Sequence, residues 1–162
     1  MGLFKSKKGS LISETFKPLQ DLGPIKAATD LVEVALYEEH LELKANFKKH
    51  EPLTLQYSQI TDAEYGMESE IVEKSRSVIG RAIAGGLLFG GVGAVVGGIS
   101  GTGTKQKEKP HFYLIISYTS KDGQDAFLQF EDTRLFKGPK LAKQLRELCG
   151  LKEDRPENIT AL

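Results

Sequence analysis

The stretch AIAGGLLFGGVGAVVGGISGTGT, residues 82–104, is uncharged and rich in glycine, alanine and apolar residues. It interrupts a chain that is otherwise charged and strand-like. Its glycines recur at four-residue spacing in two rows, Gly86 with Gly90, and Gly93 with Gly97 and Gly101. On a helix this spacing places them on one face, and such bare stripes let two backbones approach closely. The pattern predicts close packing, either in a bilayer or against other protein chains.

Length, charge and cysteine content narrow the classes of protein. A chain of 162 residues suits one domain with a real core. Lysine plus arginine and aspartate plus glutamate balance at 22 each, so no overall field would attract nucleic acid. The single cysteine, Cys149, cannot form an internal disulfide, and no export signal is recognised. We therefore expect a cytoplasmic protein without a nucleic-acid partner.

Alternating apolar and polar residues predict strands on both sides of the glycine-rich stretch. Before it, the predicted strands are 32–36, 41–47, 53–57 and 63–67, the last running on toward Val72. After it, 112–118 and 126–130 form a hairpin around the turn Lys121-Asp122-Gly123. A helix then begins near Pro139 and ends at Gly150, with Leu141, Leu145 and Leu148 as its apolar stripe. The strands on the two sides are expected to form one sheet.

The predicted fold class is α+β, mainly antiparallel β. We divide the chain into an N-terminal arm at 1–29, a domain at 30–150 that is split into 30–77 and 105–150, an insertion at 78–104, and a tail at 151–162.

About six short antiparallel strands and one capping helix resemble a pleckstrin-homology-like (PH-like) barrel. The runs YSQITDAEYG (57–66), KSRSVIGRAIAGGLLFGGVGAVVGGISGTGTK (74–105), FYLIISYTSKDG (112–123) and FLQFED (127–132) resemble a family of bacterial and prophage proteins. In that family a glycine-rich hairpin interrupts such a barrel. The resemblance covers residues 30–150 and implies a fold and a bacterial setting, but no established activity.

Topology limits the path of the insertion. As one helix, residues 82–104 would reach about 35 Å, enough to cross a hydrocarbon core of about 30 Å. A single crossing would leave the two groups of strands on opposite sides of the membrane, so they could not share a sheet. We therefore expect a glycine-zipper hairpin of two short helices, near 78–89 and 92–100, each only about 15–18 Å long. Such a hairpin can enter one leaflet or pack against protein, but it cannot span.

Glycine costs about 1 kcal/mol per helical residue relative to alanine, so an isolated hairpin needs a compensating partner. A flexible loop is the alternative, although flexible linkers favour polar residues over apolar ones. The side chains expected to insert into lipid are Leu87, Leu88, Phe89, Val92, Val95 and Val96. The side chains expected at anionic headgroups are Lys74, Arg76, Arg81, Lys105, Lys107 and Lys109. The same basic residues could instead keep the base of the hairpin in water.

Other motifs give weaker indications of function. Residues 91–97 resemble a dinucleotide-binding glycine spacing and 98–105 a phosphate loop, but the first lacks a parallel β-α-β unit and the second lacks Gly-Lys-Ser/Thr. The three histidines, His40, His50 and His111, share no metal-ligand spacing with one another or with Cys149. Cys149 itself suits a small core residue better than a nucleophile. We expect no catalytic residue, no cofactor and no metal, and hence not an enzyme.

Inositol-lipid sites in PH-like barrels use basic residues between the first two strands. The loop between the first two predicted strands is 37–40, and its glutamates Glu38 and Glu39 would repel phosphate. The lysines near the start, Lys5, Lys7 and Lys8, could let the N-terminal arm touch a membrane weakly.

Three functional hypotheses remain. The first is a non-enzymatic module whose glycine-zipper hairpin associates with the inner face of the cell membrane, peripherally or re-entrantly, with self-assembly. The second is a soluble oligomerising module that binds protein through the hairpin. The third is a membrane-permeabilising effector in which several hairpins assemble.

Overall fold

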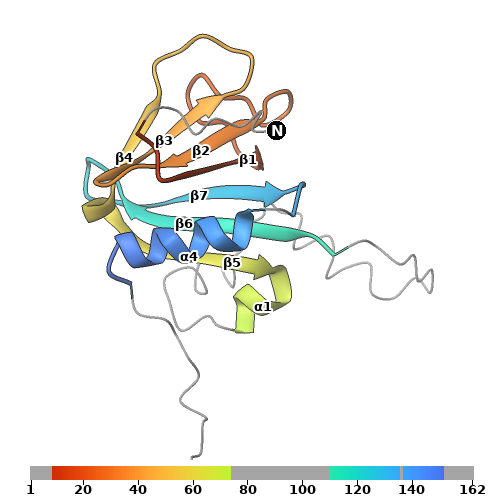
Figure 1. Ribbon diagram of the computed structural model, residues 1–162, viewed down its shortest axis with the longest axis vertical. Coiled ribbons are helices and arrows are strands. Elements are labelled where there is room, and N and C mark those ends of the chain that lie inside the picture. The colour runs from red at the N-terminus through yellow and green to blue at the C-terminus, as the bar shows by residue number, and fades with distance from the viewer. Residues whose placement is uncertain (1–8, 74–109, 136, 152–162) are drawn as a thin grey trace, which may run out of the picture.

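The computed structural model describes residues 9–73, 110–135 and 137–151 (Figure 1). The described chain forms a seven-stranded antiparallel sheet in the order β4-β3-β2-β1-β7-β6-β5. The strands are β1 (Ile12–Pro18), β2 (Val32–Leu36), β3 (His40–Ala45), β4 (Leu53–Gln56), β5 (Ile60–Met67), β6 (Phe112–Thr119) and β7 (Asp125–Asp132). The helices are a 3-10 turn at Tyr57–Gln59, α1 (Glu68–Glu73) and α4 (Gly138–Leu148). The predicted hairpin helices at 78–89 and 92–100 lie outside the described residues.

The sheet changes partners at β1. Residues from Ile12 to Phe16 pair with β2, whereas Lys17 and Pro18 pair with Glu131 and Phe130 of β7. One half-sheet therefore contains β2, β3 and β4, the other contains β5, β6 and β7, and Figure 1 shows them meeting at β1. No pairing joins β4 to β5 among the described residues. The predicted barrel is thus an open sheet rather than a closed one.

The core lies between the two half-sheets and under α4. Phe16 of β1 and Phe130 of β7 are fully buried, and their ring centroids are 5.9 Å apart. From the helix, Leu141 and Leu145 are also fully buried in the same cluster, and Leu148 packs at its border. The spacings of four and three residues between these leucines place them on one side of α4, so the helix closes one end of the core.

Asp132 accepts hydrogen bonds that connect β7 to β5 and to the loop before α4. Its Oδ2 accepts from Tyr65 Oη at 2.7 Å, and its Oδ1 accepts from the backbone N–H of Leu135 at 2.9 Å. A Cβ at Gly138 would lie 2.0 Å from the same Oδ2. Only glycine at this position lets the first turn of α4 approach the carboxylate.

Several sequence predictions are confirmed. The hairpin of β2 and β3, the strands β4 to β7 and the C-terminal helix all form where they are expected. The β6–β7 turn contains Gly123 at φ 78°, and α4 is followed by Gly150 at φ 66°. Both glycines occupy the left-handed region, which other residues rarely adopt.

Three expectations need correction. Residues 1–29 are not only a loose arm, because Ile12–Pro18 forms β1 in the middle of the sheet. The sheet consequently has seven strands rather than about six. The strand predicted to run toward Val72 ends at Met67, where the chain turns into α1.

Replacing Phe16 by alanine should lower the free energy of unfolding by about 3–5 kcal/mol, since a fully buried aromatic ring leaves a cavity at the junction of the half-sheets. Lys17→Ala, at the exposed neighbouring position, should change it by less than about 0.5 kcal/mol. Urea unfolding followed by circular dichroism measures both. Equal, small effects would mean that β1 is not part of the cooperative core.

Candidate functional site at the base of the glycine-rich segment

The two borders of the glycine-rich segment are paired in one ladder. In the β5–β6 pair, Met67 lies opposite Phe112 and Gly66 lies opposite Tyr113. The chain therefore leaves the sheet at Met67 and rejoins it on the neighbouring strand. Because adjacent strands are about 4.8 Å apart, the segment must begin and end at the same place on the sheet. This pairing excludes a single crossing that separates the two groups of strands.

Helix α1 forms the exit side of this base. Its Glu70 accepts a hydrogen bond from the backbone N–H of Met67 at 3.2 Å, which satisfies a donor at the helix N-terminus. A Cβ at Gly66 would lie 2.6 Å from Glu70 Oε2, so a side chain there would displace the carboxylate. Ile71 is 1% exposed and packs on fully buried Ile115 of β6. The exit is therefore held by the hydrogen bond to Glu70 and by the packing of Ile71.

The outer face of β6 provides the surface under α1. A small cluster surrounds the pair of isoleucines, separate from the main core, and its half-buried members are Leu19, Tyr113 and Phe127. These residues come from the segment after β1, from β6 and from β7. The base of the insertion thus has an apolar support on the side of the sheet opposite the main core.

The return side is held by side chains of β6 and the residue before it. His111 Nδ1 lies 2.6 Å from Glu131 Oε1 on β7. The ring of Phe112 stacks on Tyr65 at a centroid distance of 6.0 Å, and His111 stacks on Tyr113 at 6.5 Å. Both ends of the segment are therefore fixed to the same three strands.

The described part of the base is acidic. Glu68, Glu70 and Glu73 lie on α1, and Glu131 lies on β7. Burial, followed by the charges of Glu131 and Glu68, raises the pKa of Tyr113. A negative potential at this point favours the neutral phenol, because ionisation would add a like charge. Any basic residue near the base would find carboxylates close by.

All residues predicted to pack the hairpin, enter lipid or contact headgroups lie outside the described residues. They are Gly86, Gly90, Gly93, Gly97, Gly101, Leu87, Leu88, Phe89, Val92, Val95, Val96, Lys74, Arg76, Arg81, Lys105, Lys107 and Lys109. Sequence reasoning did not single out Glu70, Ile71 or His111 as parts of the base. The only sequence signal at the base was the apolar pair of Ile71 and Val72, which follows the predicted strand 63–67.

The histidines and the cysteine do not lie together in one site. His40 lies beside Glu42, and His50 accepts from the backbone N–H of Ala45 at 2.9 Å. The described ranges contain no group of three or more side chains that could hold a metal ion. Burial raises the pKa of Cys149 to about 11, so its thiol is protonated at neutral pH and is a poor nucleophile.

The loop at the position of an inositol-lipid site differs from the one predicted from the sequence. The predicted loop 37–40 lies between β2 and β3, with His40 already in β3. Because β1 precedes β2, the loop between the first two strands is 19–31. Its Lys26 lies 3.5 Å from Asp21, and Asp30 pairs with Lys48 at 2.6 Å. The hydrogen bond from Lys48 lowers the pKa of Asp30. Each lysine here already faces a carboxylate, which leaves no cluster of free cations for a phosphate.

None of the described helices is long and apolar enough to cross a bilayer. A family model described as "Glycine zipper containing PH domain" matches residues 24–130. The chain belongs to this family. No curated protein and no solved structure matches it. The match begins after β1 and includes both borders of the glycine-rich segment, so the PH domain of this family member contains the base described above.

Ile71→Ala should release α1 from the PH domain, because Ile71 is the buried apolar side chain among the described ones of this six-residue helix. Removing it costs about 2 kcal/mol or more. Hydrogen–deuterium exchange of peptides covering Glu68–Glu73 should accelerate, while β2 and β3 keep their protection. Ser69→Ala, on the exposed side, serves as the control. Uniform acceleration in all strands would show that α1 is part of the global core instead.

Proposed function

We propose that this chain is a non-enzymatic PH-domain module that presents a glycine-zipper hairpin to the inner face of a bacterial cell membrane. The hairpin associates with the membrane peripherally or enters one leaflet, and it supports self-assembly. The observation that carries this proposal is the pairing of Met67 with Phe112. A segment whose two ends are joined in this way leaves the sheet and returns to it at the same place.

The composition of the segment indicates that its apolar side chains are buried against lipid or protein. Of its ten glycines between Gly80 and Gly103, six fall within the two predicted helices and would cost about 6 kcal/mol there relative to alanine. Fully burying a large aliphatic or aromatic side chain returns about 1.5–3 kcal/mol. The six side chains from Leu87 to Val96 named above would therefore offset the glycine cost only when several of them are buried. Lipid insertion or packing between hairpins provides that burial.

The base of the insertion and the flanks of its apolar run carry opposite charges. The carboxylates of Glu68 and Glu70 on α1 would be repelled by anionic headgroups. The basic residues that follow and precede the apolar run would each gain about 1 kcal/mol near such a surface. In this arrangement the flanks contact lipid, and the PH domain stays behind its acidic base.

The two rival functions make different predictions for the same experiments. A soluble oligomerising module would form oligomers without binding lipid. A membrane-permeabilising effector would release a dye trapped in liposomes, and its leak would depend on the hairpin. Sedimentation and dye release therefore accompany the test of membrane association.

Deleting residues 78–104 should abolish flotation with liposomes of anionic phospholipid and leave the fold intact. Residues 74–77 and 105–109 then connect two neighbouring strands, so the β5–β6 ladder can still form. Flotation measures binding, and near-ultraviolet circular dichroism measures the fold. If the intact protein remains wholly at the bottom of the gradient, the membrane proposal fails. If the deletion variant floats as well as the intact protein, the hairpin is not the anchor.

Within the hairpin, Gly93→Leu or Gly97→Leu should weaken assembly and lipid binding much more than Leu88→Ala. A side chain on the bare stripe forces backbones apart, whereas the loss of one leucine removes only part of the apolar area. Flotation and analytical ultracentrifugation compare the three variants. Equal losses in all three would indicate that general hydrophobicity, rather than glycine packing, determines the interaction.

A further inference from the structure

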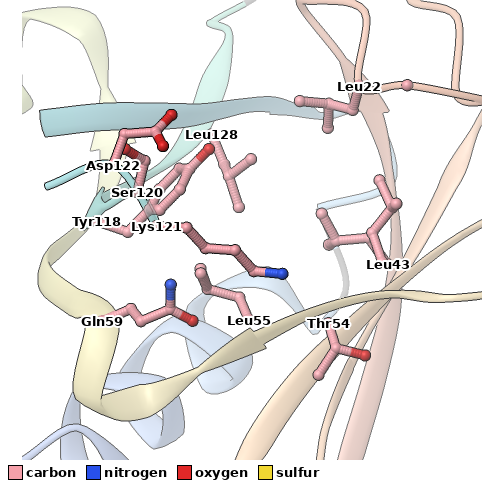
Figure 2. A pocket seen from close by; sticks show the side chains of 12 residues that line it. Leu22, Leu43, Thr54, Leu55, Gln59, Tyr118, Ser120, Lys121, Asp122 and Leu128 are labelled. Atoms are coloured by element: carbon pink, nitrogen blue, oxygen red, sulfur yellow. The ribbon is translucent and has the colours of Figure 1, made fainter. Parts of the chain in front are cut away.

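A cavity of about 500 Å³ opens at the end of β6 that is far from the glycine-rich segment. It lies between β3 and β4 of one half-sheet and the β6–β7 turn of the other, with the loop after β1 at its side (Figure 2). Its size falls within the range of about 300–1,000 Å³ that is typical of sites for small molecules. The cavity is separate from the site proposed above, because β6 runs about 24 Å between the two.

The wall of the cavity is mainly apolar. Its apolar side chains are Leu22, Leu43, Leu53, Leu55, Leu128 and Tyr118. Leu43, Leu55 and Leu128 also belong to the main core, so this part of the wall is held in place by packing. A preformed apolar wall of this kind favours an alkyl chain over a polar ligand.

One cation extends over this apolar wall. Figure 2 shows the side chain of Lys121 reaching from the β6–β7 turn into the cavity, with its amine toward Leu43 and Leu55. The carboxylate of the neighbouring Asp122 points away from that amine in the same view. No ion pair involves Lys121 within the described ranges. Its charge is therefore available to a ligand.

A second polar group lies beside the lysine. Ser120 Oγ accepts a hydrogen bond from the backbone N–H of Gln124 at 3.2 Å. Its hydroxyl hydrogen remains able to donate to an acceptor. Gln59, beside this turn, donates from Nε2 to the carbonyl of Thr119 at 3.3 Å. The β6–β7 turn thus brings an ammonium and a hydroxyl together at the mouth of the cavity.

We propose that this cavity binds a single-chain amphiphile with a negatively charged head. The alkyl chain lies against the leucines of β3, β4 and β7, and the head pairs with Lys121 and accepts from Ser120. Apolar burial contributes most of the affinity, and the single cation selects the sign of the head. A free fatty acid and a lysophospholipid share this chemistry, and they differ in the size of the head.

Binding to the full-length protein can be measured by isothermal titration calorimetry below the critical micelle concentration. The probes are decanoate, decanol and lysophosphatidic acid with a ten-carbon chain. Wild-type protein should bind at least one of the two anions more tightly than decanol. Tight binding of decanoate would identify the fatty-acid head, and binding of the lysophospholipid alone would identify the phosphate.

Lys121→Glu should weaken binding of the anion about tenfold and change that of decanol by less than about twofold, because the reversed charge acts on a charged head and not on a neutral one. The control is Lys140→Glu, the same charge change at an exposed position on α4. Leu53→Trp, at a half-buried position in the wall, should reduce binding of both probes by filling the cavity. Thermal unfolding confirms that each variant is folded.

The proposal is overturned if the wild-type protein binds none of the three probes, or if Lys121→Glu and Lys140→Glu have equal effects. Neither result would bear on liposome flotation, since the cavity residues lie outside the glycine-rich segment. Conversely, loss of flotation on deleting 78–104 would leave binding of the single-chain anion unchanged.

Discussion

The antiparallel ladder between β5 and β6 is the constraint on which the rest of the structure depends. It brings together two positions, Met67 and Phe112, that are far apart in the sequence. The loop-closure entropy of such a long connection rises only slowly with its length, so a stable ladder can carry a large insertion. The ladder is stable because Leu114 and Ile116 of β6 are fully buried in the main core. Core packing therefore determines where the glycine-rich segment starts and ends.

The strand that carries the insertion is an edge strand, which needs protection from unwanted pairing. Helix α4 supplies it. Arg146 donates to Asp62 Oδ1 at 3.1 Å and to the carbonyl of Ala63, both on β5. Glu64 Oε1 lies 3.5 Å from the same guanidinium, whose side chain is only 18% exposed. A charged pair with this little exposure is screened less than a surface pair, and it attaches the helix to the part of β5 far from the insertion.

The sequence predicted those elements whose side chains alternate or recur regularly. Val32, Val34 and Leu36 face the core as expected, and the same holds for the leucines of α4. β1 was missed because its buried face includes Glu14, which looks like a loop residue in a periodicity argument. Its carboxylate is buried because it accepts from the backbone N–H groups of Thr15 at 2.8 Å and of Lys137 at 3.0 Å. A distant backbone donor of this kind has no signature in the sequence.

The two apolar features of the molecule, the insertion and the cavity, differ in how clearly the sequence indicates them. The insertion could be recognised in the sequence because its glycines and apolar residues are contiguous. The cavity could not, because its leucines come from four separate segments and its lysine lies in a predicted turn. The β6 strand joins the two, and its residues from Leu114 to Ser117 are buried on both faces. A close-packed strand transmits displacement only if its neighbours move with it. Occupation of the cavity therefore has no route to the base of the insertion except a shift of the whole half-sheet, and the two ends are expected to bind independently.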